Sequence, residues 1–152
     1  MGEAVGEEKY FDIIEHRLKD PHHPVEDFRR IIRLSPKSCE HIRSLFRRLS
    51  EQAGVEIRYY TGGGPQFDFM IVDGRVAVIG FPTAGGKGNV GAIVLRGRTA
   101  VQGVEIVFHE LWDQSTPLFE GSKNRSSAAR LQIESQVNAV LSEIEPPEVS
   151  LS

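Results

Sequence analysis

Apolar and polar residues alternate with two different periods along this chain, and the period indicates which segments are strands and which are helices. Short apolar or alternating runs predict strands at residues 27–34, 55–60, 66–72, 75–80 and 90–95. Apolar residues at helical spacing predict helices at residues 6–19, 36–53, 99–115 and 126–145. The order of these elements predicts an α/β protein with a mixed sheet and flanking helices.

The segment 66–80 gives the strongest local prediction, which is a β-hairpin. Its first part, Gln66-Phe-Asp-Phe-Met-Ile-Val-Asp-Gly74, alternates between apolar and polar residues as a half-buried strand does. Asp73-Gly74 favours a tight primed turn, because both residues tolerate positive φ. Residues 75–80 then return as the partner strand. By contrast, the strand–helix–strand unit at 27–60 predicts a parallel crossover.

Composition limits the classes of protein to which the chain can belong. Its 152 residues and 39% hydrophobic content suit one domain with a real core. The net charge of −3 disfavours a sequence-independent nucleic-acid binder. The lone cysteine, Cys39, fits a reducing compartment, and no apolar run approaches the roughly 20 residues of a membrane span. We therefore expect a soluble cytoplasmic protein that does not bind a membrane.

The hairpin resembles the active-site strands of the phospholipase D-like superfamily, which carry His-x-Lys-x4-Asp-Gly and then a strand that ends in Gly-Ser-x-Asn. In this chain Gln66 stands at the histidine position and Asp68 at the lysine position, whereas Asp73-Gly74 and Gly80 are kept. Phe81-Pro82-Thr83 replaces Ser-x-Asn. The resemblance implies one half of a phospholipase D-like fold at residues 25–118. An N-terminal helix and linker (1–24) and a C-terminal helix with a tail (119–152) lie outside it.

The substitutions imply a degenerate active site in which no residue is catalytic. An amide at position 66 cannot attack phosphorus, and a carboxylate at position 68 repels a phosphate that a lysine would hold. The chain is thus similar to the non-catalytic effector domains of winged-helix transcriptional regulators, which implies a small-ligand sensor or a dimerising regulatory module. The predicted ligand, a small molecule or an anion, would contact Gln66, Asp68, Thr83, Lys87, Asn89 and Arg58.

Other interpretations of the same residues stay open. Gln66 and Asp68 also fit ordinary polar positions of a strand. A phosphodiesterase or nuclease could use an atypical nucleophile such as His109, and a nucleic-acid or protein adaptor is a third class. An exposed sheet and the apolar stripe on 126–145 predict a homodimer, although that helix could instead dock within its own chain.

The remaining motifs predict no further chemistry. The loop at 80–89 misses the phosphate-loop pattern, and the histidines lack partners at metal-ligand spacing, so we expect neither a cofactor nor a metal. Arginines concentrate near the first strand and the following helix, and we interpret them mainly as solvated surface: Arg29, Arg30, Arg33, Arg43, Arg47 and Arg48.

Overall fold

The structure, a computed structural model, describes residues 22, 25–34, 39–60, 68–82, 89–123 and 125–144. Its elements follow the chain in this order: β1 (Phe28–Ile32), α2 (Cys39–Leu49), β2 (Val55–Tyr59), β3 (Asp68–Val72), β4 (Val76–Pro82), β5 (Asn89–Arg96), α3 (Arg98–Gln114), β6 (Thr116–Glu120) and α4 (Ser127–Ile144). The helix predicted at 6–19 lies outside the described residues.

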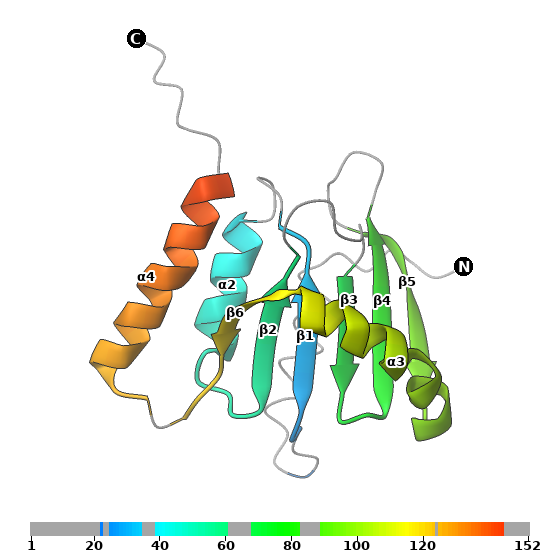
Figure 1. The fold of residues 1–152 in the computed structure, drawn as a ribbon. Helices are drawn as coiled ribbons and strands as arrows, with labels where there is room; N and C mark the ends of the chain where they lie inside the picture. Colours follow the sequence, from blue (N-terminus) through cyan, green and yellow to red (C-terminus); the bar gives the residue numbers. More distant parts are fainter. Residues whose placement is uncertain are drawn as a thin grey trace.

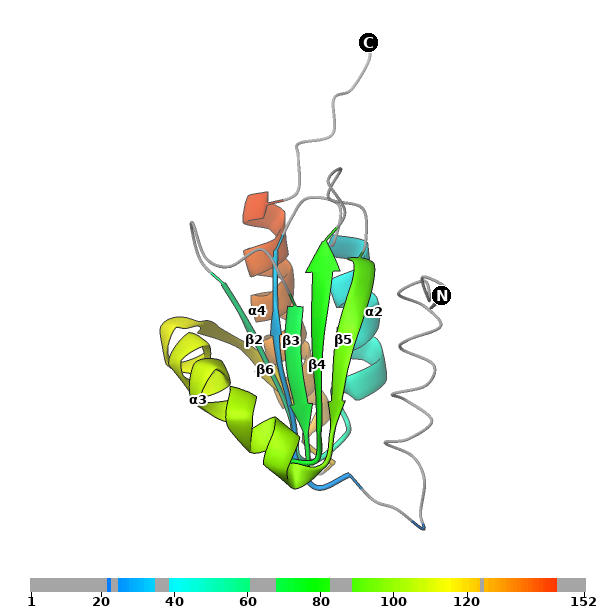
Figure 2. The same cartoon turned by 90° about the vertical axis from the view of Figure 1, so that its right-hand side faces the viewer.

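The strands form one sheet in the order β5-β4-β3-β1-β2-β6 (Figure 1). β1 and β2 are parallel, and the other neighbours are antiparallel. α3 covers one face of this sheet, and α2 and α4 lie on the other (Figure 2). The predicted mixed α/β architecture is confirmed. Among the described helices, none is long and apolar enough to cross a membrane.

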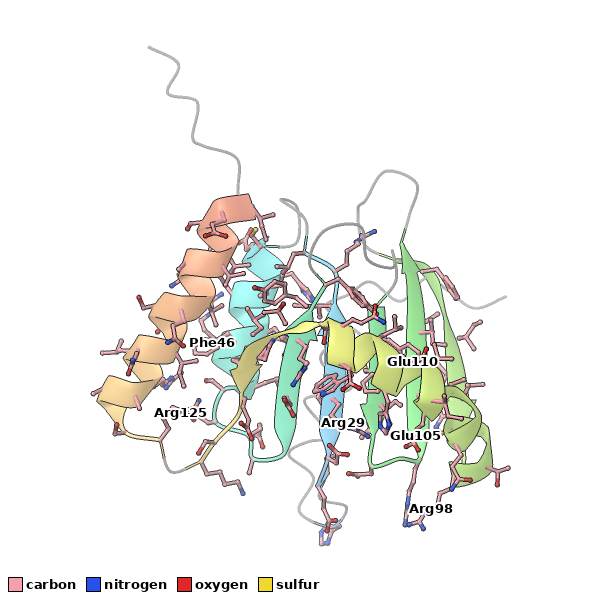
Figure 3. All side chains as sticks on the ribbon, viewed as in Figure 1. Arg29, Phe46, Arg98, Glu105, Glu110 and Arg125 are labelled. Atoms are coloured by element: carbon pink, nitrogen blue, oxygen red, sulfur yellow. The ribbon has the colours of Figure 1, made fainter. Side chains whose placement is uncertain are left out.

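Side chains alternate between two hydrophobic cores, one on each face of the sheet. Phe28 and Ile32 of β1 join the core beneath α2 and α4, whereas Ile31 joins the core beneath α3. In the first core Phe46 of α2 packs edge-on against Phe119 of β6, with ring centroids 5.1 Å apart (Figure 3). In the second, Phe108 of α3 packs in the same way on a β3 phenylalanine. The alternation fixes which strand residues can meet on one face.

The predicted hairpin is present as β3 and β4. Asp73 and Gly74 both have positive φ, 52° and 64°, as a primed turn requires. The Asp73 carboxylate also anchors the turn, because the backbone N–H groups of Glu26 and Asp27 donate to its Oδ1 at 2.9 and 2.7 Å. The tip of the hairpin is thereby fixed to the residues that precede β1.

Two predictions of element boundaries were wrong. The sequence analysis placed no strand after the helix at 99–115, yet β6 spans Thr116–Glu120, contains Pro117 and pairs with β2. An edge strand tolerates proline, because one side of its backbone has no ladder partner. The helix predicted to reach residue 53 ends at Leu49 in α2, and Gly54 has a positive φ of 82° just before β2.

The C-terminal helix docks within its own chain, which was the alternative to a dimer contact. Val137 and Leu141 of α4 are buried in the core that α2 shares with the sheet. Nε of Arg43 on α2 donates to Oδ1 of Asn138 at 3.3 Å. The apolar stripe of 126–145 is therefore largely used inside the subunit.

Candidate functional site

Arg30 and Asp68 form a buried ion pair where β1 ends and β3 begins. Nη2 of Arg30 lies 3.4 Å from Oδ2 of Asp68, and the two side chains are 4% and 17% exposed. Both residues lie on the α2 face, since they alternate with residues of the α3-side core. The backbone N–H of Arg33 donates to Oδ1 of the same carboxylate at 3.2 Å. Both oxygens of Asp68 therefore have internal partners.

His41, in the first turns of α2, belongs to the same electrostatic environment. Burial lowers its pKa from 6.5 to about 4, and the positive charges of Arg30 and Arg48 act in the same direction. Asp68 opposes them and raises that pKa. The imidazole of His41 is thus neutral at physiological pH, where it offers one donor and one acceptor.

Tyr60 follows β2 directly and is 8% exposed. Its hydroxyl is buried and makes no hydrogen bond with any part of the chain that the structure describes. Burial raises the pKa of Tyr60 to about 12, with a further contribution from the charge of Asp68. The hydroxyl therefore stays protonated and remains a donor. Buried polar groups of this kind are rare, and each calls for an explanation.

These four residues, Arg30, His41, Tyr60 and Asp68, define what we call the strand-end cluster. They come from three neighbouring strands, or their ends, and from the helix that links two of those strands. Arg30 and Asp68 face α2, whereas the Tyr60 side chain packs in the core beneath α3, close enough to Asp68 for that charge to act on its hydroxyl. The chain leaves β1 toward β2 on one side and returns to β3 on the other. In open α/β sheets, ligands bind at the carboxyl ends of strands where the strand order reverses in this way.

The structure unites only part of the predicted ligand-binding set. Asp68 lies in the strand-end cluster. Arg58 lies on the opposite face, where its guanidinium stacks over the Trp112 ring at 4.6 Å and its Nη1 donates to the Trp112 carbonyl at 2.9 Å. Asn89 begins β5 opposite Pro82. Three predicted members fall outside the described residues: Gln66, Thr83 and Lys87.

His109, the alternative nucleophile, is also far from Asp68 in the fold, because it lies on α3. Its Nε2 is 3.1 Å from Nη1 of Arg29. A guanidinium only donates, so this nitrogen accepts the bond and its lone pair is occupied. Arg29 also lies over the Phe108 ring at 5.4 Å, beside α3 (Figure 3). The contact links α3 to β1, and it occupies the ring nitrogen that a nucleophilic histidine would need free.

The basic region is less solvated than its sequence indicated. Arg30 is 3% exposed, and Arg29 and Arg58 are held against aromatic rings of α3. The interpretation as solvated surface is therefore wrong for Arg30. In β1, Phe28, Arg30 and Ile32 share a face, so strand periodicity between two apolar residues was the signal for its burial.

Sequence reasoning also left His41 and Tyr60 out of the site. Tyr60 gave no motif, and His41 was considered only as a metal ligand. Within the described residues, no three His, Cys, Asp or Glu side chains gather in a way that could hold a metal ion. Cys39 is buried at 1% exposure, as its place on the apolar stripe of the helix predicted.

No protein-family model matches this chain, and no curated protein has a significantly similar sequence. The resemblance to phospholipase D-like proteins therefore rests on the hairpin motif alone.

Proposed function

We propose that this chain is a non-catalytic, phospholipase D-like regulatory domain that recognises a small polar ligand at the strand-end cluster. The observation that carries the proposal is the buried Tyr60 hydroxyl, which has no hydrogen-bond partner in the described part of the chain. An unsatisfied buried donor destabilises a protein by about 1–3 kcal/mol. An acceptor on a bound ligand would remove this penalty, so the free energy of binding would include it.

The charges of the cluster favour a ligand held by hydrogen bonds over a phosphoryl group held by cations. The Arg30 charge is balanced by Asp68 at 3.4 Å, and burial keeps His41 neutral. A phosphate near Asp68 would meet an anion at the position where the resembling enzymes carry lysine. At about 4 Å and an effective dielectric near 20, that repulsion is on the order of 4 kcal/mol. We therefore infer recognition without cleavage.

A thermal-shift screen against a collection of polar metabolites tests the proposal. A ligand at about a hundredfold excess over its Kd stabilises the folded chain by about 2.7 kcal/mol. Asp68→Asn, which weakens the Arg30 pair, should abolish the shift. Arg58→Ala is the control, because the Arg58 guanidinium stacks over Trp112 of α3 and is not a member of the cluster. Shifts that survive Asp68→Asn but vanish with Arg58→Ala would move the site to the contact between Arg58 and Trp112.

The competing enzyme hypothesis has its own test with a chromogenic phosphodiester, bis(4-nitrophenyl) phosphate. We expect no turnover above the buffer rate, because the described part of the cluster contains no activated nucleophile. Turnover that is lost on His109→Ala would overturn the proposal in favour of an atypical phosphodiesterase.

A further inference from the structure

The two edges of the sheet differ in how they are protected from pairing with another strand. β6 is short, at five residues, contains Pro117 and ends in Glu120, and its pairing with β2 has a register shift. Short length, proline, charge and irregular register are the usual means of blocking an edge. β5, at the other edge, spans eight residues and has no proline and no charge before Arg96.

β5 also exposes large apolar side chains on both faces of the sheet. Ile93 lies opposite Ile79 of β4 and is 48% exposed, and Val94 lies opposite Val78 and is 45% exposed. Successive residues of a strand point to opposite faces. The sheet thus ends in a strand whose apolar side chains are exposed on both sides, next to an edge that no described strand covers (Figure 1).

We propose that β5 pairs with β5 of a second copy of this chain, antiparallel and about a two-fold axis at Ile93. A two-fold axis normal to the sheet keeps each residue on its own face. Residues that pair must therefore lie an even number of positions apart in the sequence. Pairing centred on Ile93 satisfies this condition and extends the sheet continuously through both subunits.

The sequence of β5 is self-complementary in this register. Leu95 faces the partner's Gly91, and Val94 faces the partner's Ala92, so that each larger side chain meets a smaller one. Only Ile93 meets its own copy, at the axis. Cross-strand apolar pairs of this kind stabilise a sheet by about 0.2–1 kcal/mol each.

The charge of Arg96, at the end of β5, is also compatible with this register. Each Arg96 lies three residues from the axis, on opposite sides of it. At about 3.4 Å per residue, the two strand positions are separated by roughly 20 Å. That distance exceeds the Debye length of about 8 Å at physiological ionic strength, so the like charges are screened. Centring the pair on Val94 would instead set Ile93 against the partner's Leu95.

This pairing is independent of the strand-end cluster. β4 separates β5 from β3, the nearest strand of the cluster, and none of the four cluster residues lies on β5 or β4. Loss of the dimer therefore leaves the ligand proposal intact, and loss of ligand binding leaves the dimer intact.

Sedimentation velocity over a roughly hundredfold range of protein concentration measures the equilibrium. The unmodified chain should shift from monomer to dimer as concentration rises. Ile93→Lys puts two like charges at the axis and should leave the chain monomeric throughout. Ile106→Lys is the matched control, because Ile106 is 73% exposed on α3 and does not belong to the paired edge strand, and it should dimerise like the unmodified chain. A chain that is monomeric at every concentration, or a dimer that Ile93→Lys leaves unchanged, would overturn the proposal.

Disulfide trapping tests the register itself. Directly paired antiparallel residues have Cα atoms about 4.5–5.5 Å apart, which lies within the range that a disulfide spans. Ile93→Cys should crosslink to itself under mild oxidation, whereas Ala92→Cys and Val94→Cys should crosslink only when the two proteins are mixed. The native Cys39 is buried, so the unmodified chain gives the background level of crosslinking. Crosslinking of Ile93→Cys no faster than that of an Ile106→Cys control would refute the pairing.

Discussion

At the scale of single residues, Asp68 has a structural role that its place in the sequence conceals. Its carboxylate accepts from the Arg33 backbone and pairs with Arg30, so the anion at this position is built into the fold. Breaking a buried ion pair by removing one member destabilises a protein by about 3–5 kcal/mol. The anion at this position therefore stabilises the fold in addition to the role proposed for it in ligand binding.

Placing a lysine at position 68, as in the phospholipase D-like motif, should consequently destabilise this chain. We predict that Asp68→Lys lowers the free energy of unfolding by about 3–5 kcal/mol, because it sets an ammonium beside the buried Arg30 guanidinium. Urea denaturation measures the loss. Adding Arg30→Met to Asp68→Lys should recover part of it. An Asp68→Lys variant as stable as the unmodified chain would show that the ion pair contributes nothing.

The buried His41 predicts how the stability of the chain depends on pH. Its pKa is about 4 in the folded chain and 6.5 when exposed, so the unfolded chain binds more protons between these values. Stability should be full above about pH 6.5 and should fall as the pH drops toward 4, by up to about 3 kcal/mol from this residue. Chemical denaturation at several pH values measures the slope. His41→Leu should flatten it, and an unchanged slope in that variant would contradict the assigned burial.

The strand-end cluster shows which residues of a site can be predicted from sequence patterns and which cannot. Asp68 could be found because it stands in a motif, and burial of Arg30 could be read from its apolar neighbours in β1. Tyr60 could not be found, because a tyrosine at the end of a strand has the same pattern whether or not its hydroxyl has a partner. Whether a polar atom is satisfied depends on side chains from other strands, and no local period encodes that.

At the scale of elements, the hairpin was predictable and β6 was not. Asp73-Gly74 encodes its own turn, since both residues adopt the positive φ that the turn requires. β6 has only five residues, includes a proline and follows a long helix directly. Its strand conformation depends on pairing with β2, a contact between residues about 60 positions apart in the sequence. Tertiary pairing of this kind overrides local propensity.

Gly121, just after β6, tests how tightly that strand is held. A Cβ at this position would collide with the backbone oxygens of Gln52 and Leu49. We predict that Gly121→Ala lowers the free energy of unfolding by about 3 kcal/mol or more, since the backbone at the end of α2 must move. Gly103→Ala is the control: nothing lies within 4 Å of its added Cβ, and alanine should stabilise α3 by about 1 kcal/mol. Equal effects of both changes, measured by denaturation, would contradict the packing of β6 against α2.

At the scale of the whole molecule, one sheet separates two proposed interactions. Polar groups concentrate where β1 and β2 end, and exposed apolar residues lie on β5 at the far edge. The apolar faces of α2 and α4 pack in the core. The sheet edge therefore remains for association with a second copy, and the strand ends remain for a ligand. Sequence patterns predicted this α/β architecture but could not assign the surfaces, because exposure depends on which strands become edges.

Thermal unfolding of the unmodified chain and of Tyr60→Phe, with and without the metabolite collection, tests the central claim most directly. Tyr60→Phe removes a buried hydroxyl that has no partner in the described residues. The variant should therefore melt about 2–4 °C higher for each kcal/mol of penalty removed, yet lose the ligand-induced shift. A variant that melts lower, or that keeps every ligand shift, would contradict the claim that this hydroxyl is kept for recognition.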